Sequence, residues 1–260
     1  MNFTTIGQAK KQTGLSYLGG INTSSKLMKN KKVSGNLTYI IYLAPSTQSG
    51  YNVCLFSTPE CRLGCLATSG RASMELNSNG KKRIQNARIV KSKLFFEDRS
   101  FFMDWMIAEI QQAQRKAIKA GYDFSVRLNG TSDIDWAIVK IDGANIFQHF
   151  PLVQFYDYTK QYLKMGDTVS NYHLTFSYSG HNTRLCKLLL EQGKNIAVVF
   201  DVKKGKALPE TFMGYPVVDG DLTDFRVNDP KGCVVGLRFK KIADKDVENI
   251  VLNSVFVVKP

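Results

Sequence analysis

The chain has 260 residues, and its 43% hydrophobic content can build a core for one large α/β domain or two small ones, which excludes a wholly disordered chain. No stretch approaches the ~20 consecutive apolar residues that span a bilayer, and the first residues lack a secretory signal pattern, so we expect a cytoplasmic protein without a membrane partner. Thirty-five Lys and Arg against 22 Asp and Glu give a formal net charge of +13, which favours an anionic partner or a solubilising surface.

Residues 1–36 are rich in Gly, Ser, Thr, Asn and Lys and show no sustained apolar period, so we predict an irregular basic N-terminal arm. Basic residues cluster in this arm and again in a second stretch at 81–93: Lys10, Lys11, Lys26, Lys29, Lys31 and Lys32, then Lys81, Lys82, Arg83, Arg88, Lys91 and Lys93. Such clusters can neutralise phosphates, so DNA or RNA is one expected partner. A solubilising charged surface explains them equally well.

Residues 37–260 are expected to form a single α/β domain. The run LTYIIYL at 37–43 has the β-branched and aromatic content of a buried strand, and residues 81–120 are expected as two helices with a break near 97–100. Six short strand candidates follow, at 124–130, 152–158, 172–180, 195–202, 215–221 and 233–239, and residues 182–194 are the clearest helix between them. The tail at 244–260 is expected to return to the core.

This alternation of strands and helices favours βαβ units and a parallel sheet. Six to eight such units over about 220 residues fit a barrel better than a small open sheet. We therefore predict an α/β fold with a partial or complete (β/α) TIM-like barrel. The alternative is an open doubly wound α/β sheet.

Three of the five cysteines crowd into CLFSTPECRLGC with the spacing C-x6-C-x3-C, which is unlike a secreted disulfide framework. We predict that Cys54, Cys61 and Cys65 are metal ligands, because thiolates are soft ligands for zinc and for iron–sulfur clusters. Three thiolates leave one iron of a [4Fe–4S] cluster open. A structural zinc would need a fourth, distant ligand, for which the candidates are Cys233, Cys186, His173 and His181.

Two other interpretations of these cysteines stay open. They could be small buried apolar side chains, although Pro59, Glu60, Arg62 and Gly64 in the same loop are not core residues. A catalytic cysteine nucleophile is disfavoured, because no His is adjacent in sequence and one thiol would suffice.

Polar residues follow the predicted strands, where a parallel barrel gathers all carboxyl ends on one face. The catalytic candidates are Asp133, Asp157, His181 and Asp221, and the cofactor-binding candidates are Asn129, Ser177, Ser179 and Asp219. Carboxylates and imidazole suit proton transfer or cation binding. Asp and Asn after strands also make ordinary turns and helix caps, and a lone loop His is often only solvated.

The segment from Cys54 to Arg71, together with DGDLTDFRVNDPKGCVVGLRF near the end, resembles the gene product 88 family of phage and bacterial proteins. The resemblance covers residues 37–240 and implies a viral or mobile-element origin, hence a host-cell cytoplasmic location, more than an activity.

A second, fold-level likeness is to radical S-adenosylmethionine enzymes, which carry three cluster cysteines after the first strand of a partial barrel. Those enzymes usually have C-x3-C-x2-C, so the spacing here departs from theirs, and RLNGTSD at 127–133 replaces their Gly-Gly-Glu motif. The likeness implies an iron–sulfur cluster and S-adenosylmethionine as cofactors.

Three functions are compatible with these patterns. The first is an enzyme whose thiolate-bound cluster, at the mouth of the barrel, acts on a small-molecule or nucleic-acid-linked substrate. The alternative is a non-catalytic nucleic-acid-binding protein with a structural zinc or cluster, and the third is a structural phage protein without a metal. A cluster with an open iron predicts only three protein ligands, whereas a structural metal predicts four protein ligands.

Overall fold

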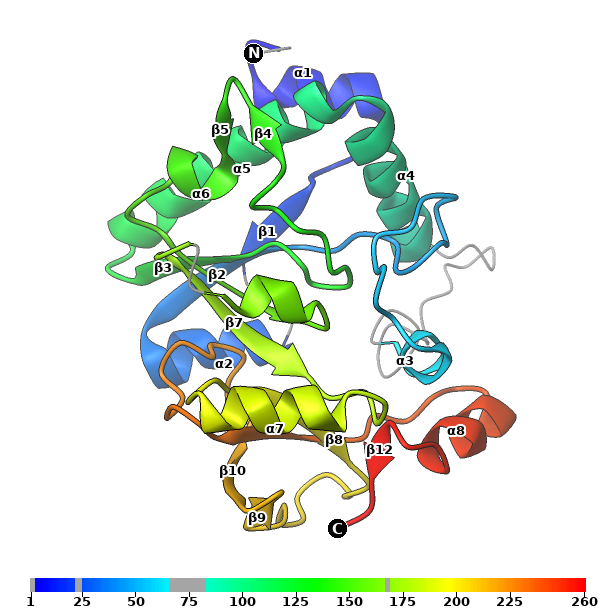
Figure 1. Cartoon of the computed structure of the whole chain (residues 1–260). Coiled ribbons are helices and arrows are strands. Elements are labelled where there is room, and N and C mark those ends of the chain that lie inside the picture. Colours follow the sequence, from blue (N-terminus) through cyan, green and yellow to red (C-terminus); the bar gives the residue numbers. More distant parts are fainter. Residues whose placement is uncertain (1–2, 22–24, 66–82, 167–168) are drawn as a thin grey trace.

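The computed structural model describes residues 3–21, 25–65, 83–166 and 169–260 (Figure 1). Its main sheet has the strand order β1 (Gly19–Ile21), β2 (Asn36–Ile41), β3 (Asp123–Arg127), β6 (Gln154–Thr159), β7 (Tyr172–Ser177), β8 (Ile196–Phe200), β11 (Val234–Arg238), β10 (Tyr215–Asp219) and β9 (Thr211–Phe212). A last strand, β12 (Val257–Val258), also pairs with β8, and β4 (Lys140–Ile141) and β5 (Ala144–Asn145) form a separate hairpin.

The expected mostly parallel sheet is confirmed. Within the main sheet, β2, β3, β6, β7, β8, β11 and β10 pair in parallel in that order, and only β1 and β9 are antiparallel to their neighbours. These two short strands end the order, so the described strands do not close into a ring and an open α/β sheet fits. From β2 to β8, each new strand of the main sheet joins beside the preceding one, without the reversal of a doubly wound fold.

The helices follow their sequence signals. The two predicted helices at 81–120 are α4 (Arg83–Glu97) and α5 (Arg99–Lys119), and the break is Asp98, whose carboxylate accepts a hydrogen bond from Phe101 N. The predicted helix at 182–194 is α7 (Thr183–Glu191), and the tail forms α8 (Lys245–Leu252) before β12. The remaining helices are α1 (Ile6–Thr13), α2 (Ser25–Ser34), α3 (Pro59–Leu63), α6 (Ile146–His149) and the 3-10 turn η2 (Tyr162–Met165). Among the described helices, none has the length and apolar character to cross a membrane.

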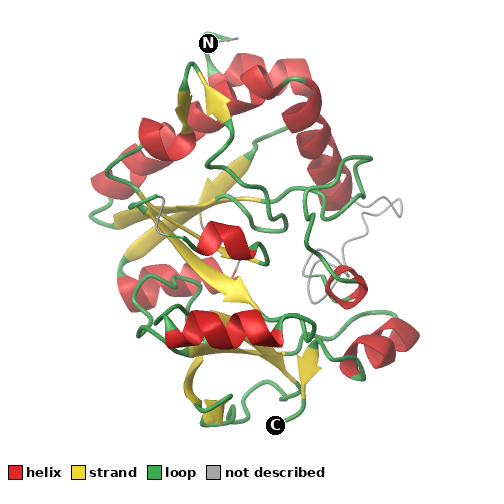
Figure 2. Cartoon of the chain, in the orientation of Figure 1, coloured by secondary structure: helices red, strands yellow, loops and turns green. Residues whose placement is uncertain are grey.

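The N-terminal arm is not irregular, because α1, β1 and α2 lie within it (Figure 2). The buried carboxylate of Glu109 on α5 accepts hydrogen bonds from Leu18 N, from Gly19 N at 2.9 Å and from the Tyr39 hydroxyl at 2.7 Å. This long-range clamp orders a segment whose own apolar pattern is weak, which is why the sequence pattern did not predict it.

The two faces of the sheet differ in chemistry. The outer face packs Tyr39, Val126 and Phe155 under α5, and Phe176 and Val198 join the cluster that includes residues of α7. The opposite, inner face carries alternating polar side chains: Asn36, Thr38, Ser125, Arg127, Tyr156, Tyr158, His173 and Thr175. It is covered by α2 and by residues 222–230, because Asn30 of α2 bonds both to Thr38 and to the backbone N of Asp224.

Candidate functional site

The cysteine segment follows the carboxyl end of β2 and ends on α3. The Thr58 side chain caps α3 by accepting from Cys61 N, and Pro59 occupies its first turn. Next to α3, Gly64 lies so close to α8 that an added Cβ would stand 3.2 Å from Val251, in agreement with the neighbouring positions of α3 and α8 in Figure 1. The α8 helix therefore supports the cysteine segment.

Cys54, Cys61 and Cys65 are all half-buried. The pKa of the Cys54 thiol is raised to about 12, mainly by burial and in part by the negative charges of Cys65, Asp133 and Cys61, so the three sulfurs share one electrostatic neighbourhood. Within the described parts of the chain, however, no three His, Cys, Asp or Glu side chains stand in an arrangement that could hold a metal ion. The donor chemistry suits a soft metal, while the side-chain placement is not that of a formed site.

Asp133 joins the loop after β3 to the cysteine segment and to the end of β6. Its backbone N donates to Val53 O at 2.8 Å, next to Cys54. Its carboxylate accepts from Thr159 Oγ1 at 2.8 Å and from Lys164 Nζ at 3.1 Å. The predicted residues Asp133 and Cys54 thus lie in one region.

Asn129 and Asp157 belong to the same region. The Asp157 side chain is fully buried and accepts from the backbone N of Leu128 at 3.2 Å and of Asn129 at 2.9 Å, where β3 and β6 no longer pair. Burial raises the Asp157 pKa to about 7, partly offset by the positive charge of Arg127. The Asn129 side chain orders its own loop by accepting from Trp136 Nε1 at 3.1 Å. These contacts are structural, and the predicted catalytic and cofactor roles stay predictions.

His181 and the two predicted serines lie at the carboxyl end of β7. His181 Nε2 is 3.7 Å from Glu60 Oε2, next to Cys61, and the His181 side chain is 58% exposed. Ser177 and Ser179 are bonded through their backbones to Asn182, which donates to Ser177 O and accepts from Ser179 N. The structure therefore brings His181 beside the cysteine segment. The Asn182 side chain holds the loop of residues 177–182 in place.

Asp219 and Asp221 form a separate group at the end of β10. Arg238 Nη1 is 2.9 Å from Asp219 Oδ1 and 3.3 Å from Asp221 Oδ2. The Arg238 hydrogen bond holds the pKa of Asp219 below its usual value, although burial opposes the shift. Asp219 and Asp221 therefore belong to a local ion-pair cluster around Arg238.

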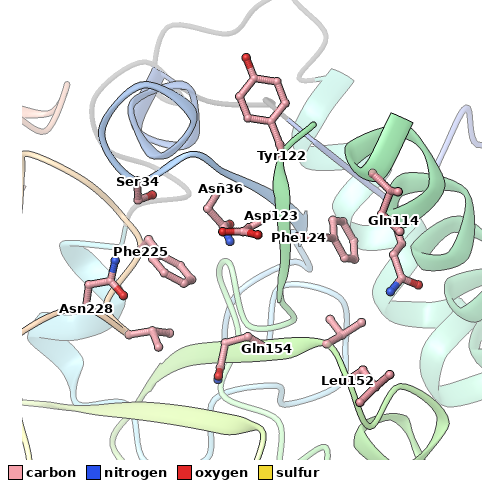
Figure 3. A pocket seen from close by; sticks show the side chains of 13 residues that line it. Ser34, Asn36, Gln114, Tyr122, Asp123, Phe124, Leu152, Gln154, Phe225 and Asn228 are labelled. Carbon is pink, nitrogen blue, oxygen red and sulfur yellow. The ribbon is translucent and has the colours of Figure 1, made fainter. Parts of the chain in front are cut away.

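The described residues include a pocket of about 460 Å³ at the amino ends of the strands, opposite the carboxyl ends where the predicted site residues were expected (Figure 3). Its lining comes from the amino ends of β2, β3 and β6, from α5 and from residues 225–228, and includes Asn36, Asp123, Gln154, Leu152 and Asn228. The expected pocket at the carboxyl ends is therefore not the one seen in Figure 3. None of the eleven predicted site residues lines it.

The inner face carries a further group of polar residues, of which Tyr158, Asp224 and Arg226 were expected from the sequence as polar residues near strand ends, while Arg127 and Asp229 were missed. Arg127 bonds to Asp224 at 2.7 Å and lies over the Tyr158 ring, while Arg226, only 1% exposed, lies 3.2 Å from Asp229. The signal for Arg127 was its polar character at an alternate position of β3, whereas Asp229 lies in the loop between β10 and β11, where no strand pattern applies.

A family model described as Gene product 88 matches residues 10–250. No curated protein and no solved structure matches the chain.

Proposed function

The chain belongs to the Gene product 88 family, and from the ligand chemistry and partial exposure of its clustered cysteines we propose that it is a metalloprotein whose thiolates Cys54, Cys61 and Cys65 bind an iron–sulfur cluster or, alternatively, zinc. When bound, such a cluster would supply an iron open to a substrate or to S-adenosylmethionine. The proposed activity is an enzyme acting on a small-molecule or nucleic-acid-linked substrate.

One observation carries the proposal. Cys54, Cys61 and Cys65 are half-buried in a loop at the carboxyl end of a parallel sheet, whereas Cys186 and Cys233 are 0% exposed and pack in the core. Core packing therefore accounts for Cys186 and Cys233 and in part for Cys54, which packs against the main core cluster, and it leaves Cys61 and Cys65 without that explanation. Ligands commonly bind at the carboxyl ends of parallel strands.

The strand order supports a partial-barrel interpretation of the sheet. Strands β2, β3, β6, β7 and β8 are parallel neighbours in chain order, which is the order of a (β/α) barrel. We propose that the inner face corresponds to the inside of this partial barrel.

Anaerobic purification followed by metal analysis and an ultraviolet–visible spectrum tests the metal. We expect iron with a thiolate charge-transfer band, or zinc, in the parent protein, and loss of the metal in Cys54→Ser, Cys61→Ser and Cys65→Ser. Cys186→Ala is the matched control and should keep the metal, because Cys186 packs in the core. A parent protein that contains no stoichiometric metal would refute the proposal.

The alternative is a non-catalytic nucleic-acid-binding protein, favoured by exposed lysines on α1 and α2. If these lysines contact phosphates, affinity for DNA or RNA should fall steeply with salt, and Lys10→Glu combined with Lys11→Glu should weaken binding and flatten the salt dependence. Lys203→Glu combined with Lys204→Glu reverses two equally exposed charges elsewhere and serves as the control. Absence of binding at low salt would exclude this alternative.

A further inference from the structure

Three side chains project together from the inner face of β6 and β7. Tyr158 on β6 pairs in register with Thr175 on β7, and His173 stands two residues before Thr175 on the same face of the strand. Tyr158, His173 and Thr175 therefore form one patch of polar side chains, which we name the inner-face triad.

The triad contains polar atoms without a hydrogen-bond partner in the part of the chain that the structure describes. The Tyr158 hydroxyl, His173 Nε2 and Thr175 Oγ1 are all inaccessible to solvent and unbonded, and Thr175 as a whole is 0% exposed. A buried polar group without a partner costs about 1–3 kcal/mol, so three on one face are unusual. Such a set is expected where a ligand supplies the missing partners.

The unbonded donor groups around the triad indicate the kind of ligand. Burial lowers the pKa of His173, and the positive charges of Arg226 and Lys194 lower it further, whereas Tyr158 lies near two arginine–carboxylate pairs, Arg127–Asp224 and Arg226–Asp229. Arg226 Nη2 donates to Thr223 O at 2.7 Å, while its Nε has no hydrogen-bond partner among the described residues. Hydroxyl, imidazole and guanidinium N–H groups all donate to oxygen acceptors.

We propose that Tyr158, His173, Thr175 and Arg226 bind an oxyanion, the carboxylate or phosphate group of a small molecule, on the inner face of the sheet. The site is distinct from the cysteine segment, and the proposal holds whether or not the cysteines bind a metal. The neighbouring pairs Arg127–Asp224 and Arg226–Asp229 hold the two guanidinium groups in place beside it.

The test uses the full chain with inorganic phosphate and succinate as separate probes in isothermal titration calorimetry. We expect one probe to bind, which distinguishes a phosphate from a carboxylate ligand. Thr175→Val keeps the shape of the side chain and removes only the hydroxyl, so it should weaken binding about tenfold and raise the melting temperature of the free protein, since it removes an unsatisfied buried group. Tyr158→Phe should likewise weaken binding of the probe and raise the melting temperature of the free protein.

The matched control is Tyr215→Phe, which removes the hydroxyl of a half-buried tyrosine on β10, and its affinity for the probe should equal that of the parent. The Cys54→Ser variant should bind the probe like the parent, so failure of the metal proposal leaves this result intact. The proposal is overturned if neither probe binds, or if Thr175→Val stabilises the protein without any loss of affinity.

Discussion

At the scale of single residues, the buried carboxylate of Asp157 makes the protein sensitive to pH. Its pKa of about 7 lies above the ~3.9 of an unfolded chain, so the folded state binds the proton more tightly. The stability that this group contributes is fully present below about pH 4 and is lost as the pH rises through about 7, with a slope of at most ~1.4 kcal/mol per pH unit. Urea unfolding of the parent between pH 5 and pH 8 should show this decline.

Asp157→Asn removes the titration, so its free energy of unfolding should vary less over the same range than that of the parent. The absolute stability of the variant should be lower, because an amide offers one acceptor where Leu128 N and Asn129 N use two oxygens. Asp123→Asn, at an exposed position, should keep the parent's slope. Identical slopes in all three proteins would contradict the assignment of the effect to Asp157.

At the scale of elements, the clamp from α5 decides whether β1 stays on the sheet. Glu109→Ala would leave Leu18 N, Gly19 N and the Tyr39 hydroxyl without their acceptor, and we expect a loss of about 2–4 kcal/mol in the free energy of unfolding. Glu109→Gln keeps one acceptor oxygen and should cost less. Amide hydrogen exchange should rise in residues 17–21 of the alanine variant and stay unchanged in β7, and an unchanged exchange rate in residues 17–21 would show that other contacts hold β1.

At the scale of the whole molecule, the end of the chain supports a segment nearly 200 residues earlier. Val257 on β12 is 4% exposed, pairs with Val199 and packs in one cluster with Val251 of α8, on which Gly64 rests. Val257→Asp buries an unpaired charge and should cost about 3 kcal/mol. Thiol labelling of Cys61 and Cys65 should then accelerate, whereas Val255→Asp, at a 54% exposed position, should label like the parent. Equal labelling rates in the parent and in Val257→Asp would show that the tail does not support the cysteine segment.

The sequence by itself determined the elements with a strong local pattern. The run at 37–43 predicted β2, the apolar period of residues 101–117 predicted α5 with its start near Asp98, and the six later runs predicted β3, β6, β7, β8, β10 and β11. Strand and helix periods are local properties, so the residues that form them are recognisable without the partner.

Only the tertiary structure decided which side chains meet. It placed Asp133 near Cys54, joined Asp219 and Asp221 to Arg238, and brought Tyr158, His173 and Thr175 onto one face. It also left β1 and β9 at the ends of an open sheet and formed α1, β1 and α2 within the segment predicted to be irregular. The physical reason is that strand pairing, burial of a carboxylate and the clamp by Glu109 depend on contacts between residues far apart in the chain, and local periodicity contains no information on such contacts.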